Sequence, residues 1–455
     1  MARPTRLGLL GAVAVSLSIV SPTLAVSLNP QAIAEEVGGA VPLVYLLALG
    51  PILLIAGAFA VLTSRFGSVD SVVGLLTTTV GPRAGAVSGF VLLTAYLMAI
   101  PGTLSAFGMF SQGLLARAFS EDLADWWFFP VGVIVLVASF LIARSAIKSV
   151  GNVLLSIEGL SVVGIVLVSL TALFVMVRGL GSADQRVELT DLSLTGVNLP
   201  AIGVALTFAV VSVAGFEAAA AVGESTDNAK RNIPRAVVGT AVGAILFYAG
   251  VAAVAVWAFD DPTREFGSLE AQLSLPVALA DEFFGTWVGT LLLALAALTC
   301  LAGSIGACVA GSRMLVGLAR GGRLPRGLLQ RRVKSEEPER ALAATAILGI
   351  VATAGCVALV GPNLFKVFEL AGVTTGFLFL TVYAAVCAVA ARVLLREGKL
   401  IRAGLMALGA VMALVIFAVT FFPLPEGWAR WGPILALVAV IAAILLGSRG
   451  QRVRP

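Results

Sequence analysis

Histidine is absent from this chain of 455 residues, and charged residues make up only 12% of it. Without histidine there is no imidazole to act as an acid, a base or a metal ligand, which excludes histidine metal sites and HExxH proteolysis. A soluble domain carries about 25% charged residues. The charges in this chain are too few to cover a globular surface that faces water on every side, so the composition excludes an ordinary soluble protein.

Cysteine is also scarce, and its placement excludes two further kinds of site. The four cysteines are isolated and lie inside apolar segments: Cys300, Cys308, Cys356 and Cys387. This pattern is typical of small apolar packing residues and not of a disulfide framework or a zinc site. We therefore expect no structural metal, no cofactor and no prosthetic group.

Apolar residues are abundant instead, at 59% of the chain, with a mean hydropathy of +1.04. They occur in runs of about 20 residues, the length that crosses a bilayer. Backbone polar groups cannot stay unpaired in hydrocarbon, so these runs must be helices. The sequence predicts an all-α integral membrane protein, one domain over 1–455, of about twelve transmembrane helices: 8–28, 41–63, 85–115, 127–144, 154–178, 199–222, 235–259, 286–319, 341–361, 364–391, 400–422 and 431–447.

The first 27 residues have a basic start, an apolar run and a small-residue end, as in a signal peptide. Cleavage of this segment is one interpretation. We expect instead that it forms the first transmembrane helix, because the rest of the chain is embedded in the membrane.

The distribution of Lys and Arg predicts the orientation. With the N-terminus in the cytoplasm, all but six of the 30 basic residues fall on the cytoplasmic side. The exceptions are Arg117, Arg178, Arg186, Arg264, Lys366 and Arg430. Both termini are therefore predicted to be cytoplasmic, in a multi-pass protein of the cytoplasmic (inner) membrane. Because the basic residues lie in short loops, the net charge of +5 does not indicate nucleic-acid binding.

Two predicted spans carry residues that interrupt a helix. The first contains SIVSPTLA, in which Pro22 removes a helical hydrogen bond in mid-membrane, and the sixth contains SVAGFEAA, in which Gly215 precedes Glu217. Taken singly, these features are a proline kink and a packing glycine. Spans one and six are equivalent if 8–178 and 199–391 are two repeats followed by peripheral helices in 400–447, and paired interruptions of this kind indicate an inverted-repeat transporter.

Three motifs resemble those of the amino acid–polyamine–organocation superfamily of permeases, in its amino acid permease branch. They are GFE at 215–217, GESTDNAKRNIPRAV at 223–237 and GSRMLVGLARGGRLP at 311–325. The resemblance implies a leucine-transporter-type fold, a 5+5 inverted repeat in which helices 1 and 6 are broken. Two departures are that span five lacks the lysine of some proton-coupled members and that GSVDSVV at 67–73 lacks a tyrosine common at that loop.

Two interrupted helices side by side suit a zwitterion, because free amides attract a carboxylate and exposed carbonyls attract an ammonium. The predicted substrate-binding residues are those of the two breaks and hydroxyl or aromatic groups near them: Ser18, Ser21, Pro22, Thr23, Tyr96, Ser212, Gly215, Phe216 and Glu217. An intramembrane carboxylate costs roughly 2.5 kcal/mol or more unless it is paired or protonated. Glu217 is therefore the predicted proton-coupling residue, although a structural glutamate bonded to the broken backbone of helix one is the alternative. Glu158 and Glu369 are assigned to helix packing.

We expect secondary active transport of amino acids or related amines by alternating access, with proton-coupled symport or exchange and no enzymatic activity. The expected partners are a small-molecule amino acid or amine, H+ and the lipid bilayer, in a monomer or homo-oligomer. Three alternatives stay open. They are a transporter of the same fold for another small solute, a polytopic membrane enzyme, and a membrane sensor that binds without transporting.

Overall fold

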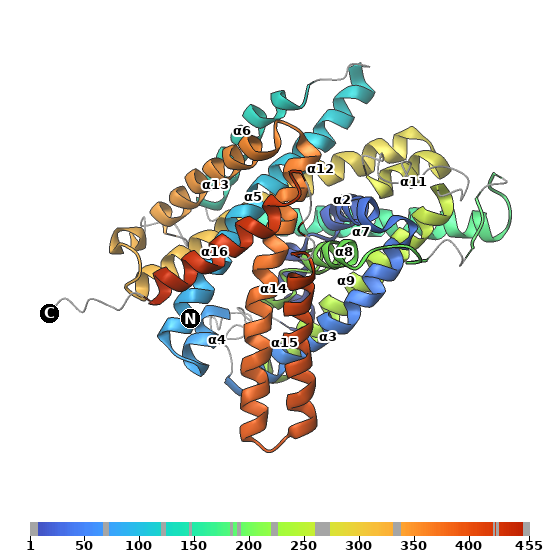
Figure 1. Cartoon of the computed structure of the whole chain (residues 1–455). Helices are drawn as coiled ribbons and strands as arrows, with labels where there is room; N and C mark the ends of the chain where they lie inside the picture. The colour runs from blue at the N-terminus through green and yellow to red at the C-terminus, as the bar shows by residue number, and fades with distance from the viewer. Residues whose placement is uncertain are drawn as a thin grey trace.

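The computed structural model describes residues 8–66, 72–119, 124–144, 148–182, 185–188, 193–219, 226–259, 274–330, 338–421, 424 and 427–448. These residues form helices joined by turns and loops, and no β-strand occurs among them (Figure 1). The all-α architecture predicted from the apolar runs is confirmed. The side chain of Ser18 and the chain ends, on which part of the predicted orientation depends, lie outside the described residues.

The helices follow one another along the chain with short connections. In order they are α1 (Leu9–Val20), α2 (Pro22–Val37), η1 (Gly38–Ala40), α3 (Val41–Phe66), α4 (Val72–Thr79), α5 (Pro82–Phe119), η2 (Asp125–Trp127), α6 (Phe128–Arg144), α7 (Lys148–Val177), α8 (Leu199–Val211), α9 (Ala229–Phe259), α11 (Leu275–Phe284), α12 (Thr286–Arg320), η5 (Arg326–Leu329), α13 (Glu339–Val360), α14 (Leu364–Arg396), α15 (Leu400–Val419) and α16 (Trp431–Ser448).

Eleven stretches of the described chain are long and apolar enough to cross a membrane. One of them, Pro22–Arg65, has 44 residues and contains α2, η1 and α3. A single crossing takes about 20 residues, and Gly38 ends α2 with a positive φ of 67°. This stretch therefore holds two crossings. The first crossing also includes α1, which at 12 residues is too short to cross a membrane by itself. The segments correspond to the twelve predicted from the sequence.

The first predicted span ended too early. We placed its end at residue 28, just before Asn29, Pro30 and Gln31, but α2 continues to Val37. Asn29 and Gln31 are buried, and each donates a hydrogen bond: Asn29 to Ser212 and Gln31 to the Ser27 carbonyl. Polar residues with bonded side chains do not need water, so they do not end a helix at the protein interior.

Three further differences lie at connections between spans. The α9 helix begins at Ala229, six residues before the predicted seventh span of 235–259, and Pro234 lies within it. The short helices α4 and α11 lie in links between the predicted spans, outside every helix that we predicted. Both have at most ten residues, too few for an apolar periodicity to identify them against a membrane span.

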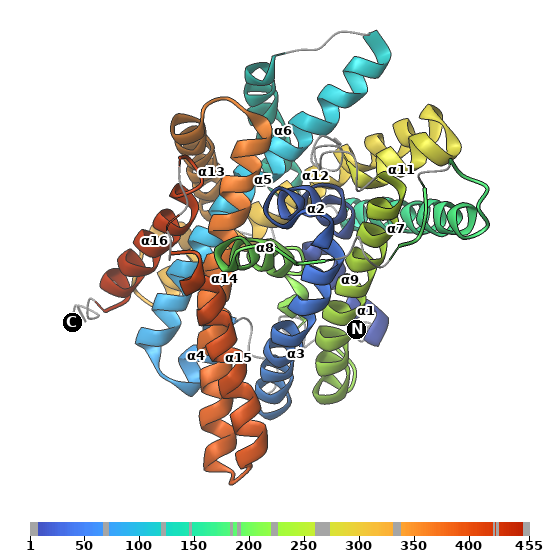
Figure 2. The ribbon, with the colours of Figure 1, turned by 45° about the vertical axis from the view of Figure 1, so that its right-hand side comes forward.

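Helices at equivalent positions of the predicted repeats pack against each other. The α5 helix packs along α12, α3 along α9, and α2 beside α8, and α14 lies beside α15 in an antiparallel pair (Figures 1 and 2). The largest cluster of buried apolar residues runs through α2, α3, α9 and α14. This arrangement places both interrupted helices at the centre of the molecule.

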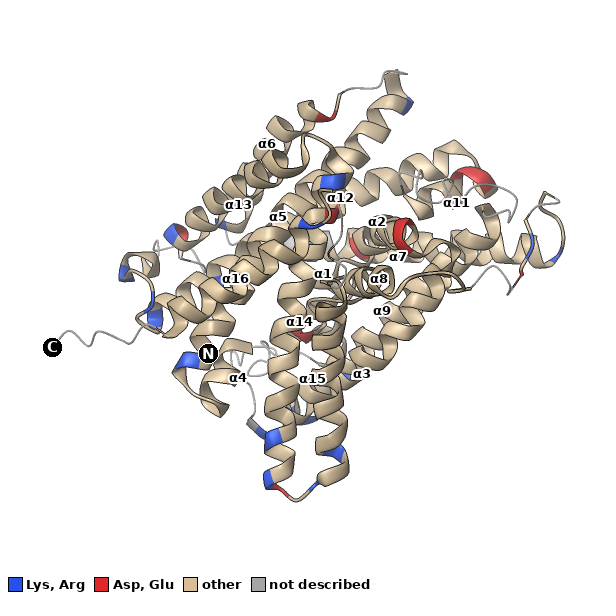
Figure 3. Ribbon diagram, in the orientation of Figure 1, with Lys and Arg blue, Asp and Glu red and all other residues tan. Residues whose placement is uncertain are grey.

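Charged residues gather near helix ends and connections, as Figure 3 shows. Three of the ion pairs each join two helix ends: Arg65 with Glu397, Arg144 with Glu339, and Arg117 with Asp281. In every case, both partners were predicted to lie on the same side of the membrane. The pairs are therefore consistent with the predicted alternation of sides.

Candidate functional site: a cavity between two interrupted helices

The first interruption lies at Ser21, between α1 and α2. Ser21 adopts a left-handed conformation, with φ 47° and ψ 66°. Pro22 follows it and has no N–H, so the carbonyl of Ser18 has no helical donor. The next amide, that of Thr23, donates to the Glu158 carboxylate at 2.7 Å. The Ile19 carbonyl therefore loses its usual partner as well, and the end of α1 presents carbonyl oxygens.

Glu158 of α7 has a role that the sequence did not predict. We placed it near a span end, but α7 begins at Lys148, ten residues earlier, and Glu158 is only 7% exposed. No side chain caps the start of α2 from Ser21, its own N-cap residue. The Glu158 carboxylate, which belongs to the neighbouring helix α7, caps α2 instead and lies next to the positive end of its dipole. Its isolated position in an apolar run was the available signal.

The second interruption follows Val211, where α8 ends. Residues 212–215 form a turn and residues 216–219 a short 3₁₀ helix. Gly215 has φ +107°, a backbone conformation that residues with a side chain rarely adopt. A Cβ atom there would also lie 2.5 Å from Ile19 Cγ2 and 3.2 Å from the Ile19 carbonyl carbon. The two interruptions therefore pack directly against each other, and glycine permits that contact.

Glu217 is buried behind this second interruption, 5% exposed. Its Oε2 atom accepts hydrogen bonds from the Gly215 amide at 3.1 Å and from the Tyr383 hydroxyl at 2.9 Å. Among the described residues, no Lys or Arg forms an ion pair with it. Glu217 and Glu158 thus have parallel roles, because each buried carboxylate accepts an amide at one interruption.

Ser16 ties the two interrupted helices together and was not predicted. Its hydroxyl donates to the Phe216 carbonyl at 2.7 Å and accepts from the Ala219 amide at 3.1 Å. This one side chain of α1 thereby bonds a backbone carbonyl and a backbone amide of the second interruption. A serine in an apolar span gives no sequence signal for such a contact, since the partner is 200 residues away.

Ser212 lies at a node of hydrogen bonds inside the protein. Its hydroxyl accepts from Asn29 at 2.7 Å and donates to the Phe208 carbonyl at 2.7 Å, and its own carbonyl accepts from Tyr248 at 2.9 Å. The hydroxyl of Tyr45 lies 3.3 Å from the Ser212 hydroxyl. These contacts hold α2, α3 and α9 around the end of α8.

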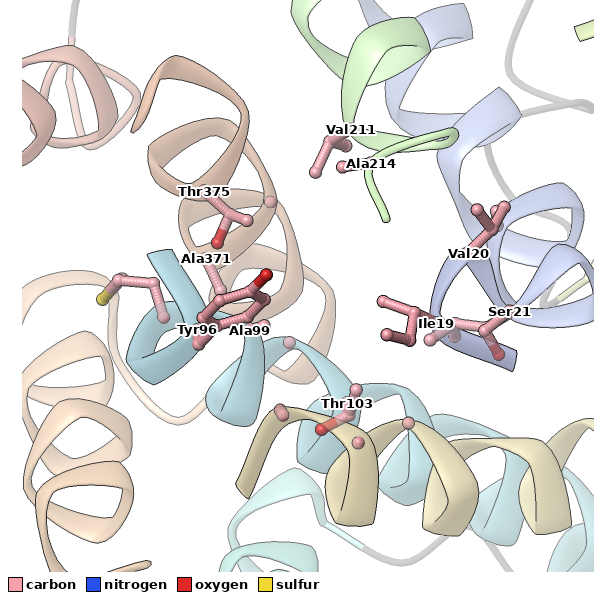
Figure 4. A pocket seen from close by; sticks show the side chains of 18 of the residues that line it. Ile19, Val20, Ser21, Tyr96, Ala99, Thr103, Val211, Ala214, Ala371 and Thr375 are labelled. Carbon is pink, nitrogen blue, oxygen red and sulfur yellow. The ribbon is translucent and has the colours of Figure 1, made fainter. Parts of the chain in front are cut away.

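A cavity of about 150 Å³ lies between the interruptions and the helices α5, α12 and α14. In Figure 4, Ile19, Val20 and Ser21 form one wall, and Tyr96, Ala99, Ala371 and Thr375 form the wall opposite. Val211 and Ala214 close it from α8 and the turn that follows. The full lining is Ile19, Val20, Ser21, Leu24, Ala25, Asn29, Tyr96, Met98, Ala99, Gly102, Thr103, Val211, Ala214, Gly303, Gly306, Ala307, Ala310, Phe368, Ala371, Gly372, Thr375 and Phe379.

Two of the predicted binding residues, Ser21 and Tyr96, line this cavity. The others with described side chains are not among the residues that line it: Pro22, Thr23, Ser212, Gly215, Phe216 and Glu217. Phe216 packs against Phe59 and Tyr383, with ring centroids 5.9 and 5.7 Å apart. Three further polar residues of the lining were not predicted: Asn29, Thr103 and Thr375.

The arrangement offers different groups to the two ends of a small ligand. The carbonyl end of α1 attracts a positive group, and the start of α2 attracts a negative one. One amide at each interruption is held by a carboxylate of the protein, and in this respect the structure differs from the expectation of free amides at the breaks. Hydroxyl groups of Ser21 and Tyr96 and the apolar wall complete the cavity.

Comparison with known protein families gives one match over nearly the whole chain. The model of the amino acid permease family matches residues 7–444, nearly the whole chain, including both interruptions and every helix that lines the cavity. None of the curated proteins compared with the chain matches it. The chain belongs to the amino acid permease family, within the amino acid–polyamine–organocation superfamily.

Proposed function

We propose that this permease carries amino acids, or closely related amines, across the cytoplasmic membrane by alternating access. The observation that supports this most directly is the cavity enclosed by the two interruptions. Interrupted helices at equivalent positions let the two halves of a transporter rock around a fixed site. The match to the amino acid permease family points to a transporter rather than an enzyme.

The substrate is held by its α-amino and α-carboxylate groups. Its ammonium lies at the carbonyl end of α1, where Pro22 and the Thr23–Glu158 bond have removed the helical donors. Its carboxylate lies toward the start of α2 and the Ser21 hydroxyl, which lines the cavity. Tyr96 and Phe379, whose ring centroids are 5.8 Å apart, cover the side chain from the opposite wall.

Glu217 couples transport to protons. Its carboxylate holds the Gly215 amide at the second interruption, and an ionised carboxylate accepts such a bond about twice as strongly as a neutral group. Adding a proton therefore weakens the bond that fixes this turn against Ile19. Proton uptake and the geometry of the interruption are linked through this one contact.

The experiment is uptake of labelled amino acids into proteoliposomes that contain the purified protein. A proton gradient and a sodium gradient are imposed separately, and empty liposomes serve as the control. We expect accumulation of at least one amino acid that the proton gradient drives and the sodium gradient does not. Absence of both uptake and exchange for every amino acid tested would contradict the proposed function.

A further inference from the structure

The described residues that line the cavity include no Asp, Glu, Lys or Arg. The polar side chains in the lining are Ser21, Asn29, Tyr96, Thr103 and Thr375, all uncharged. The helix ends offer groups for one ammonium and one carboxylate. A third charge, on the side chain of a substrate, would face apolar wall without a partner, which is costly away from water.

The wall formed by α12 consists of very small residues, and two of them are glycines that differ in what surrounds them. A Cβ atom at Gly303 would lie 3.1 Å from Thr103 Cγ2, a tight contact that already closes this part of the wall. A Cβ atom at Gly306 would meet no heavy atom within 4 Å. Gly306 lines the cavity, so its missing side chain is open space that a substrate can fill.

We infer, on the basis of the proposed transport function, that the cavity selects neutral amino acids with small to medium apolar side chains, and that Gly306 sets the upper limit of side-chain size. The volume of about 150 Å³ agrees with this choice. An apolar cavity of about that volume binds benzene. It therefore takes a compact aliphatic amino acid in preference to one with a long charged side chain.

The experiment compares five labelled amino acids in proteoliposomes: alanine, leucine, phenylalanine, lysine and glutamate. The proteins compared are wild type, Gly306→Ala, Gly306→Val and a control, Gly317→Val. Gly317 lies on the same helix and is exposed, and a Cβ atom there would also meet no heavy atom within 4 Å. The control therefore makes the same chemical change, on the same helix, away from the cavity.

In wild type, we expect alanine and leucine uptake to exceed lysine and glutamate uptake by about tenfold or more. The ratio of leucine to alanine uptake should fall about tenfold in Gly306→Val, fall less in Gly306→Ala, and stay unchanged in Gly317→Val. Because a ratio is measured within one preparation, differences in the amount of inserted protein cancel.

Uptake of lysine or glutamate at the rate of leucine would overturn the inference, as would an unchanged leucine-to-alanine ratio in Gly306→Val. If Gly306→Val does not insert into liposomes, an unchanged ratio in Gly306→Ala overturns it in the same way. Failure of the proposed function gives a different result, because wild type then takes up none of the five amino acids.

Discussion

At the scale of single residues, the site is governed by which carboxylates the fold buries. Glu158 and Glu217 each lie in an apolar helix environment, and each accepts a backbone amide that an interrupted helix has released. The cost of burying a carboxylate is offset when it accepts such bonds. Both residues thereby control the geometry of an interruption, and Glu217 also bonds to Tyr383.

Changing Glu217→Gln should separate substrate binding from proton coupling. Glutamine retains an oxygen that accepts from Gly215 and Tyr383, but it does not change its charge with pH. We expect the variant to exchange substrate across the membrane at near wild-type rate and to lose accumulation driven by the proton gradient. Both are measured in the proteoliposome assay, as counterflow and as uphill uptake.

Tyr383→Phe is the matched control for Glu217→Gln, because it removes one bond to Glu217 and leaves the carboxylate in place. It should keep proton-driven accumulation. If Glu217→Gln accumulates substrate with the wild-type pH profile, Glu217 is structural and the coupling role is refuted.

At the scale of helices, α2 depends on a residue from another element. The carboxylate of Glu158 accepts the Thr23 amide at 2.7 Å, where Ser21 provides no side-chain cap. Changing Glu158→Leu should leave that amide unpaired and cost about 1–3 kcal/mol of stability. Glu158→Gln retains an acceptor and should cost less. Thermal unfolding of the detergent-solubilised variants measures both, and equal losses would show that the bond to Thr23 does not stabilise α2.

The hairpin of α14 and α15 is fastened to the end of α3 by charge. The Arg65 guanidinium donates to Glu397 at 2.7 Å and Lys399 donates to it at 2.8 Å. Hydrogen bonding from Arg65, followed by that from Lys399, lowers the pKa of Glu397 from 4.5 to about 2. A lowered pKa in the folded state means that this contribution to stability is complete above pH 4.5 and is lost as the pH falls towards 2.

The change Glu397→Gln should therefore lower the unfolding temperature at pH 7, and the difference from wild type should shrink as the pH falls from 4.5 towards 2. Arg65→Gln should reproduce the loss at pH 7, because it removes the main partner. High salt should weaken the effect, since these side chains are partly exposed. A difference that stays constant with pH would exclude this ion pair as its cause.

Most of the helices could be predicted from sequence because a bilayer requires long apolar runs. The interruptions were also predictable, since Pro22 and Gly215 act through local backbone geometry. The extension of α2 to Val37 was not, because the polar residues Asn29 and Gln31 are tolerated only through contacts made after folding.

The same distinction applies to the site. Ser21 and Tyr96 were predicted to bind substrate and do line the cavity. Thr103 and Thr375 line it too, but a threonine in a transmembrane helix commonly bonds its own helix, as Thr103 does to the Ile100 carbonyl. Sequence alone does not show which face of such a helix is turned towards the cavity.

At the scale of the whole molecule, we propose that 8–178 and 199–391 are two inverted repeats, with peripheral helices in 400–447. In support, helices at equivalent positions pack together: α2 with α8, α3 with α9, and α5 with α12. Two repeats related by an axis in the membrane plane bring such pairs to their common interface. The cavity lies at that interface, where both interruptions meet.

The ion pairs between helix ends test the alternation of sides, and the excess of Lys and Arg gives the absolute direction. Arg117 pairs with Asp281 at one side, and Arg144 pairs with Glu339 at the other. We expect a reporter active only outside the cytoplasm to be active when fused after Glu188, and one active only in the cytoplasm to be active when fused after Gln330. Arg144 belongs to the predicted cytoplasmic side, so a fusion after it provides an internal control. If the fusions after Glu188 and Gln330 report the same side, a crossing has been missed between them. If both report the reverse of the expected sides, the number of crossings stands and the predicted cytoplasmic location of both termini is wrong.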